Sequence, residues 1–205
     1  HNVLTLAAVP GILAKGGAHW AELGDGASRG TQAYQLSGAL RRPGLVETPF
    51  GITLGELLNG FGGGPREGRR LRAAQVGGPL GAWTPASLFG TRATWEGMAE
   101  AGGMLGHGGV VAVDDRTRIG DMARFAMRFC AAESCGKCAP CRIGSVRAVE
   151  LIDGLLAGDA TCRAPLDALC ETMREASACG LGALAPLPVQ SALRHFPEDF
   201  PPCAP

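Results

Sequence analysis

The chain has 205 residues, long enough for one large domain or two small ones, and 46% of them are apolar, so it can bury a core without disulfides. Basic and acidic residues number 19 each, and this balance argues against nucleic acid or an anionic membrane surface as a partner. The longest apolar runs, such as 110–113, are far shorter than the roughly 20 residues that span a bilayer. We expect no direct membrane insertion, and protein surfaces as partners.

The number and spacing of the cysteines indicate the redox environment of the protein. The chain holds eight cysteines, three of them as C-x2-C-x2-C at 135–141. No charged segment followed by an apolar one, the pattern of a secretory signal, precedes the folded part. Without an export signal, this spacing favours metal binding or redox chemistry over disulfides. We expect a reducing, cytoplasmic environment and, because the first residue is His1, a part of a longer chain.

The first half of the chain predicts a small sheet crossed by a helix. Residues 1–32 hold a short apolar helical pattern around Val9, broken by paired glycines. Residues 33–51 predict two strands around a turn at 42–44, and Thr53 with Glu56 forms a capping box for a helix that stops at the glycines 62–64. Further short strands are expected near 72–76 and 110–113. Together these elements indicate a compact α+β module.

From Ile119 onward the apolar pattern has the helical period. Three stripes predict three helices, and a short fourth is expected after Pro188. The stripes are Ile119, Met122, Phe125, Ala126 and Phe129; Ile143, Val146, Val149 and Ile152; and Leu166, Leu169, Met173 and Ala176. The cysteine run falls between the first two helices, so we expect it on a loop held by a small helical bundle.

The run ESCGKCAPCRIG, residues 133–144, carries the chemistry. Cys135, Cys138 and Cys141 can point three thiolates into one concavity, while the intervening amides donate hydrogen bonds to sulfides. A structural zinc usually takes a ligand pair from each of two loops, and no second C-x2-C pair exists here. The spacing therefore favours a [4Fe-4S] cluster with one distant ligand, with zinc and a thiol redox loop as the alternatives.

The fourth ligand must come from another cysteine. Cys130 would complete a C-x4-C-x2-C spacing, but it continues the apolar stripe of the first helix, and Cys170 lies at helical intervals from Leu166, so both are interpreted as core residues. Cys162 and Cys203 have no geometric argument in their favour. Cys179 opens Cys-Gly-Leu-Gly, where glycines allow the backbone to approach a cofactor, and we predict it as the ligand.

Other charged residues have weaker roles. Lys137 is interpreted as solvated, and the alternative is that its charge raises the reduction potential of the cluster. Arg142 opposes the dipole at the start of its helix, which suggests an anionic neighbour, and the alternative is a surface position without a specific role. The arginines at 66, 69, 70 and 72 are interpreted as a solvated face, with a docking patch as the alternative. The chain has no P-loop, GxGxxG or GxSxG motif in a suitable setting for nucleotide binding or hydrolysis. The sequence therefore indicates an electron-transfer site but no substrate-binding site.

Two segments, ESCGKCAPCRIG and CGLGALAPLPVQSALRHF at 179–196, resemble the family of flavoprotein subunits of the NADH dehydrogenase module. This family includes the 51-kDa subunit of respiratory complex I, the diaphorase subunit of NAD-reducing hydrogenases and the beta subunit of NAD-dependent formate dehydrogenases. The phrases at 128–153 and 193–200 resemble the formate dehydrogenase member most. The resemblance covers essentially the whole chain.

The resemblance implies an organisation and a set of cofactors. Residues 1–29 would be the tail of an FMN- and NADH-binding domain mostly absent here, 30–116 a ubiquitin-like, soluble-ligand-binding β-grasp domain, and 117–205 a helical bundle with the [4Fe-4S] site. The implied cluster ligands are Cys135, Cys138, Cys141 and Cys179. FMN and NAD would belong to the intact subunit, and only Asn2 and Thr5 are candidate FMN contacts in this chain.

The resemblance also implies a function. The cluster would relay electrons between FMN and clusters of partner subunits, namely a small thioredoxin-like [2Fe-2S] subunit and a large iron–sulfur or molybdopterin catalytic subunit. This stretch alone would be inactive with NAD. An alternative of another class is an interaction module in which a cluster or zinc staples the helices.

Overall fold

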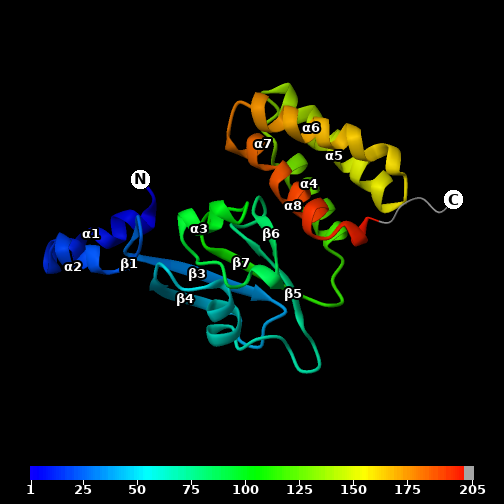
Figure 1. The fold of residues 1–205 in the computed structure, drawn as a ribbon. Helices are drawn as coiled ribbons and strands as arrows, with labels where there is room; N and C mark the ends of the chain where they lie inside the picture. Colours follow the sequence, from blue (N-terminus) through cyan, green and yellow to red (C-terminus); the bar gives the residue numbers. More distant parts are fainter. Residues whose placement is uncertain (201–205) are drawn as a thin grey trace.

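The computed structural model describes residues 1–200 of the chain and shows a mixed sheet joined to a group of helices. Five strands form the sheet in the order β4-β3-β7-β5-β6, with β3 and β7 parallel and the other neighbours antiparallel. The strands are β3 (Thr31–Gly38), β4 (Gly44–Pro49), β5 (Leu71–Val76), β6 (Ala82–Pro85) and β7 (Gly109–Asp114). Figure 1 shows β3 and β7 side by side in the middle of this sheet.

The order of elements along the chain is that of a β-grasp. The hairpin β3–β4 leads into the π-helix η1 (Glu56–Phe61), then into β5 and β6, the short helix α3 (Trp95–Glu100) and the central strand β7. The predicted capping box is confirmed: Glu56 accepts from the Thr53 backbone N–H at 2.9 Å, and Thr53 Oγ1 accepts from the Glu56 N–H at 3.1 Å. Strand β6 and helix α3 were not predicted, because both are short.

The β-grasp core consists of apolar side chains from the sheet, η1 and α3. Tyr34 is fully buried there and donates its hydroxyl to the Ala93 carbonyl at 2.9 Å, which satisfies the polar end of the ring. The other members with no exposed surface include Leu54, Leu57, Leu58, Val76, Met98, Leu105 and Val110. The prediction of an α+β fold with a β-grasp domain and a helical bundle is confirmed.

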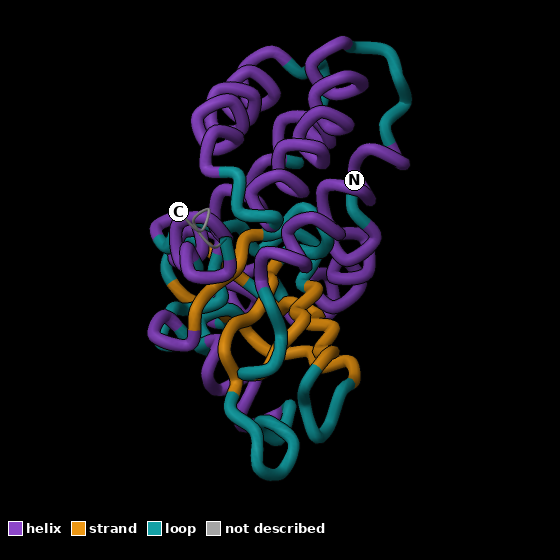
Figure 2. Tube along the Cα trace, turned by 90° about the vertical axis from the view of Figure 1, so that its right-hand side faces the viewer, coloured by secondary structure: helices purple, strands orange, loops and turns teal. Residues whose placement is uncertain are grey.

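Five helices follow the sheet, in the half of the molecule opposite the strands (Figure 2). They are α4 (Ile119–Glu133), α5 (Ala139–Leu156), α6 (Arg163–Ala176), α7 (Gly180–Leu184) and α8 (Pro186–His195). The short helix after Pro188 in fact begins at Pro186, because proline is tolerated in the first turn of a helix. Helix α7 was not predicted.

The predicted stripes of α4 and α5 are partly wrong. Phe125 is 66% exposed and Ile143 is 54% exposed, although both were expected to face the core. The buried face of α4 instead carries Ala123, Met127 and Cys130 beside Ile119 and Ala126. The buried face of α5 carries small residues, among them Gly144, Ser145 and Ala148. Small residues permit close helix packing, so the buried face was not the most apolar one.

Part of the sheet belongs to the core of the bundle, which is distinct from the β-grasp core. Trp83 on β6 is 1% exposed and belongs to the same buried cluster as Ile119, Ile152 and Val189 of the bundle. Its backbone N–H donates to Ser191 Oγ on α8 at 2.9 Å. The bundle therefore packs directly on the edge of the sheet that β5 and β6 form. The boundary that we placed between 116 and 117 remains a prediction.

Two of the four clustered arginines do not form the solvated face that we expected. Arg69 contacts Asp114 at 2.9 Å and Asp115 at 3.0 Å. Arg72 donates to both carboxylate oxygens of Asp199, at 2.9 and 2.8 Å. Asp199, 7% exposed, also accepts from the first backbone N–H groups of α4, so it caps that helix from a distant part of the chain. Arg66 and Arg70 are exposed, as the sequence predicts.

The N-terminal part lies outside the sheet. It consists of α1 (Val3–Lys15), α2 (Gly17–Glu22) and the two-residue strands β1 (Gly24–Asp25) and β2 (Ser28–Arg29). Helix α1 is strongly apolar, yet none of its residues is buried. Figure 1 shows α1 and α2 at the opposite end of the molecule from α5 and α6. Within residues 1–200, no helix combines the length and the apolarity needed to cross a bilayer.

Candidate metal centre

The cysteine run lies where the sequence predicts, between α4 and α5. Helix α4 ends at Glu133, and Cys138 is the N-cap of α5, so the loop between them spans only 134–138. Gly136 adopts φ +74°, a conformation that a side chain would strain, and this lets the loop turn between Cys135 and Cys138. Cys141 lies in the first turn of α5 and is 4% exposed.

A second loop brings Cys179 into the same region. Helix α6 ends at Ala176, and Cys179 is the N-cap of α7. The backbone amide of Ala178, next to Cys179, is the main cause that lowers the pKa of the Cys138 thiol. A Cβ atom added to Gly182 would lie only 2.8 Å from the Cβ of Cys141, so glycine allows α7 to approach α5. The structure therefore joins the two cysteine-bearing loops, which are about 40 residues apart in sequence.

The environment of Cys138 favours a thiolate. The backbone N–H groups of Ala178 and Cys141 donate to its sulfur, and the Arg142 guanidinium adds positive charge, so the pKa of this thiol lies below its usual range. Arg142 also donates to the Gly136 carbonyl at 2.9 Å and so holds the loop. This contact gives Arg142 a polar neighbour near the start of its helix, and the anionic neighbour remains a prediction.

The remaining cysteines are not candidate ligands of the metal centre. Cys130 and Cys170 are fully buried, and burial raises the pKa of their thiols to about 11 and about 12 respectively. Their interpretation as core residues is therefore confirmed. Cys162 donates to Asp159 at 3.5 Å and lies beside Gly154, near the opposite end of α5 from Cys141. Cys203 lies outside the described residues.

The four predicted ligands differ in exposure. Cys141 is buried and Cys138 half-buried, whereas Cys135 and Cys179 are exposed. Among residues 1–200, no three His, Cys, Asp or Glu side chains lie together closely enough to hold a metal ion. The structure thus juxtaposes the two loops without gathering their sulfurs, and the ligand set remains a prediction.

The residues around the loops fit an iron–sulfur centre. Such a centre requires cysteine ligands that lose their proton readily and backbone amide donors, and Cys138 has a lowered pKa caused by backbone amides. The Ser177 hydroxyl is buried and has no hydrogen-bond partner among the described residues, although it lies beside Gly182 and Cys141. A buried hydroxyl normally has a partner, so this one indicates an acceptor that the protein itself does not supply. Ser177 is not singled out by the sequence, because a serine near a cysteine carries no specific signal.

The two candidate FMN contacts lie at the start of α1. Asn2 is the N-cap, and its Oδ1 accepts from the Leu4 backbone N–H at 2.8 Å. Thr5 is exposed on the same helix. Their role in binding FMN remains a prediction.

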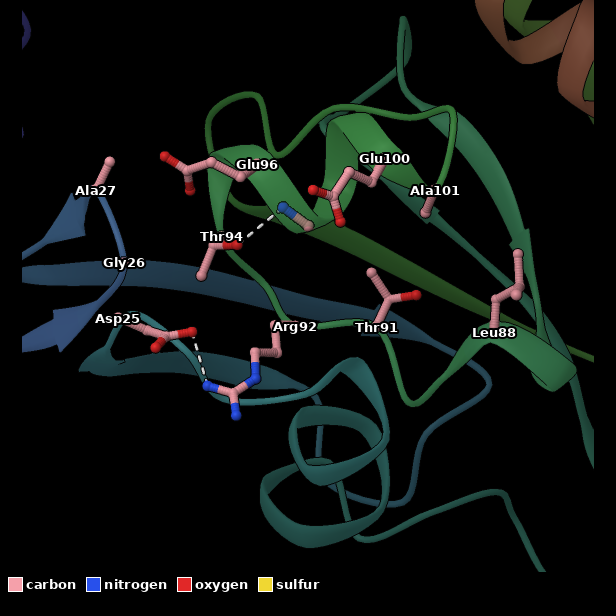
Figure 3. Close-up of a pocket in the computed structure, with 11 residues that line it drawn as sticks. Asp25, Gly26, Ala27, Leu88, Thr91, Arg92, Thr94, Glu96, Glu100 and Ala101 are labelled. Carbon is pink, nitrogen blue, oxygen red and sulfur yellow. Dashed lines mark hydrogen bonds and ion pairs between the residues drawn. The ribbon is translucent and has the colours of Figure 1, made fainter.

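The structure also contains hollows away from the cysteines. One, of about 490 Å³, lies between the β1–β2 turn and α3, where Asp25 contacts Arg92 at 2.7 Å (Figure 3). Glu96 and Glu100 line the same hollow. A second, more apolar groove of about 780 Å³ runs along η1 beside Phe61 and Phe89. No cysteine lines either one.

Comparisons with known proteins agree with the geometry. Residues 121–202 match the family described as the NADH-ubiquinone oxidoreductase-F iron-sulfur binding region. Over 98% of its length the chain is 35% identical to the HndC component of the NADP-reducing hydrogenase of Solidesulfovibrio fructosivorans, and it covers 41% of that protein. It is 37% identical to the F 2 component of the NADH-quinone oxidoreductase of Rhizobium meliloti (strain 1021), covering 98% of this chain and 48% of the relative.

Solved structures give the same result. A crystal structure of an NAD+-reducing [NiFe]-hydrogenase in the H2-reduced state matches with a TM-score of 0.86 and 33% identity, covering 98% of this chain and 33% of that chain. The chain thus spans less than half the length of the curated relatives named above. Residues 121–202 thus match the iron–sulfur binding region, and the chain as a whole is similar to the C-terminal part of flavoprotein subunits of the 51-kDa type.

Proposed function

We propose that this chain is the electron-relay part of a flavoprotein subunit in a multi-subunit, NAD-linked oxidoreductase. Its [4Fe-4S] cluster would pass single electrons between FMN and the clusters of partner subunits. The observation that carries the proposal is the close approach of the two cysteine-bearing segments, where Gly182 of α7 lies against Cys141 of α5, inside the region that matches the iron–sulfur family. When bound, the cluster supplies one-electron redox chemistry.

We assign Cys135, Cys138, Cys141 and Cys179 as the cluster ligands. Cys138 is the N-cap of α5, where backbone N–H groups and the helix dipole favour negative charge. Arg142 adds a positive charge beside Cys138. These residues would stabilise the thiolates, whose negative charge is otherwise costly near a partly buried surface.

FMN and NAD are assigned to the intact subunit. Asn2 and Thr5 are proposed as FMN contacts at the start of α1, and the rest of the flavin and nucleotide sites would lie in segments that this sequence does not contain. The exposed apolar surface of α1 supports this proposal, because a helix with no buried residue and such high apolarity normally packs against other protein. The small thioredoxin-like [2Fe-2S] subunit and a large catalytic subunit are the proposed partners.

Among the possible complexes, we propose an NAD-dependent formate dehydrogenase, on the basis of the phrases at 128–153 and 193–200. Respiratory complex I and NAD-reducing hydrogenase are the alternatives, and the named relatives belong to an NADH-quinone oxidoreductase and a hydrogenase. Identification of the subunits that copurify with the native protein tests this choice. A molybdopterin subunit supports the formate dehydrogenase, whereas a hydrogenase subunit or membrane subunits would select an alternative.

The cluster itself is tested by anaerobic purification of the chain. We expect a brown protein with about four irons and about four acid-labile sulfides. A colourless protein with one zinc would contradict the relay and would favour a structural staple.

The ligand assignment is tested by two serine variants. Cys179→Ser should lose most of the iron, because serine removes the soft thiolate that a cluster requires. Cys170→Ser is the matched control on α6 and should keep the iron, since Cys170 is a neutral, fully buried thiol. Iron and sulfide analysis measures both. Retention in the first variant together with loss in the second would overturn the assignment.

A further inference from the structure

The Ser134 hydroxyl lies at the sulfur of Cys141. The Oγ to Sγ distance is 3.2 Å, and the Gly136 backbone N–H approaches the same oxygen at 3.4 Å. In the free thiol either group can be the donor. A metal-bound cysteine is a thiolate without a proton, so in the loaded protein Ser134 must be the donor and Cys141 the acceptor.

The Ser177 hydroxyl lies on the second loop, beside the same Gly182 that packs against Cys141. A Cβ placed on Gly182 would lie 2.4 Å from Ser177 Oγ and 2.8 Å from the Cys141 Cβ, so these three residues converge. Ser177 Oγ is buried and finds no partner within residues 1–200. Burial of an unpaired hydroxyl is unfavourable, and sulfur of the centre would supply the missing acceptor.

We infer that Ser134 and Ser177 are positioning residues of the iron–sulfur centre, whose hydroxyls donate to sulfur on its Cys141 side and raise its reduction potential. The physical reason is charge. The centre gains one electron on reduction, and hydrogen bonds to its sulfurs stabilise the more negative, reduced form. The inference rests on the proposed function and adds two residues that the ligand set does not contain.

Ser145 provides a matched control. It is fully buried and also contacts Cys141, but its hydroxyl donates to the Cys141 backbone carbonyl at 2.7 Å rather than to sulfur. Ser145→Ala therefore removes a nearby buried hydroxyl without removing a donor to the centre. A purely structural effect of serine removal would appear in this variant as well.

The test is a redox titration of the whole chain, with dithionite as the reductant and in the presence of redox mediators. The electron paramagnetic resonance signal of the reduced centre measures the extent of reduction. At a fixed potential, Ser134→Ala and Ser177→Ala should each lower the ratio of reduced to oxidised centre by about fivefold to tenfold, where tenfold corresponds to about 59 mV for one electron. Ser145→Ala should leave the ratio unchanged. Equal ratios in the parent and in both test variants, or an equal fall in all three variants, would overturn the inference.

Iron and sulfide content is measured first in every variant. If Ser134→Ala loses the centre, Ser134→Thr is titrated in its place, because threonine keeps the hydroxyl. A Ser134→Thr variant that keeps the centre at the parental potential supports the role of the hydroxyl, and a Ser134→Thr variant that loses the centre overturns this role. A parent chain without iron would instead contradict the proposed function, and the inference with it. A loaded parent with unmoved potentials in the variants would contradict the inference alone.

Discussion

Cys130 and Cys170 are buried without any exposed surface, and burial raises their pKa to about 11 and about 12. Both therefore stay neutral near pH 7 and act as small apolar side chains. Cys138 has the opposite environment, because two backbone N–H groups and Arg142 lower the pKa of its thiol. The same residue type thus serves packing at one position and is suited to metal binding at another, and the difference lies in the donors around the sulfur.

Asp114 gives a pH-dependent prediction at the scale of one residue. Its hydrogen bond from Arg69, at 2.9 Å, is the main cause that lowers its pKa from 3.8 to about 2. Because the pKa in the folded protein is below that in the unfolded chain, the carboxylate stabilises the fold at pH values above 3.8, and this contribution is lost as the pH falls toward 2.

Asp114→Asn should therefore lower the free energy of unfolding at pH 7 by about 1 to 2 kcal/mol, and by less at pH 3. Urea unfolding of parent and variant at both pH values measures the difference. Both proteins are compared in the iron-free form, because metal binding by thiolates depends on pH itself. A difference of the same size at pH 7 and pH 3 would refute the role of ionised Asp114.

At the scale of elements, the capping box at the start of the crossing helix could be predicted from four residues. Thr53 and Glu56 exchange hydrogen bonds as the pattern requires. Thr53→Ala should lower the free energy of unfolding by about 1 kcal/mol, and Thr53→Ser, which keeps the hydroxyl, should cost less. Urea midpoints measure both, and equal losses in the two variants would show that the hydroxyl is not the stabilising group.

The helices of the bundle could be predicted, but their buried faces could not. Apolar periodicity located α4, α5 and α6 correctly, yet Phe125 and Ile143 point outward. The reason is that α5 buries its small residues, among them Gly144 and Ala148, against its neighbours. Which face of a helix is buried depends on the elements that pack against it. The apolar periodicity of the helix alone does not reveal these neighbours.

At the scale of the molecule, Trp83 joins the sheet to the bundle. It belongs to the bundle core although it lies on β6, and it is 1% exposed. Trp83→Ala should lower the free energy of unfolding by about 3 to 5 kcal/mol, because it leaves a large cavity at the contact of both parts. Trp95→Ala is the matched control, since Trp95 is 49% exposed, and it should cost far less.

Urea unfolding followed by far-UV circular dichroism compares the two tryptophan variants. Loss of helix and strand signal at the same, lower urea concentration in Trp83→Ala would agree with Trp83 linking the sheet to the bundle. An unchanged midpoint in this variant would contradict the role of Trp83 as the link.

Elements with strong local signals, and the chemistry of the cysteine run, could be predicted from the sequence alone. The spacing of Cys135, Cys138 and Cys141, the capping box at Thr53 and the apolar periodicity after Ile119 are local properties, which a few neighbouring residues specify. Cys130 and Cys170 could also be assigned to the core, because they continue helical stripes. The short elements β6, α3 and α7 carry too few residues for a pattern to emerge.

Which distant groups meet became visible only in the folded chain. Folding brings Gly182 to Cys141, and Asp199 to Arg72 and the start of α4. These contacts join residues that are tens of positions apart, and they depend on how α6, α7 and α8 fold back on α4, α5 and the sheet. Hydrogen bonds act over about 3 Å, so no spacing in the sequence reveals them until the chain has folded.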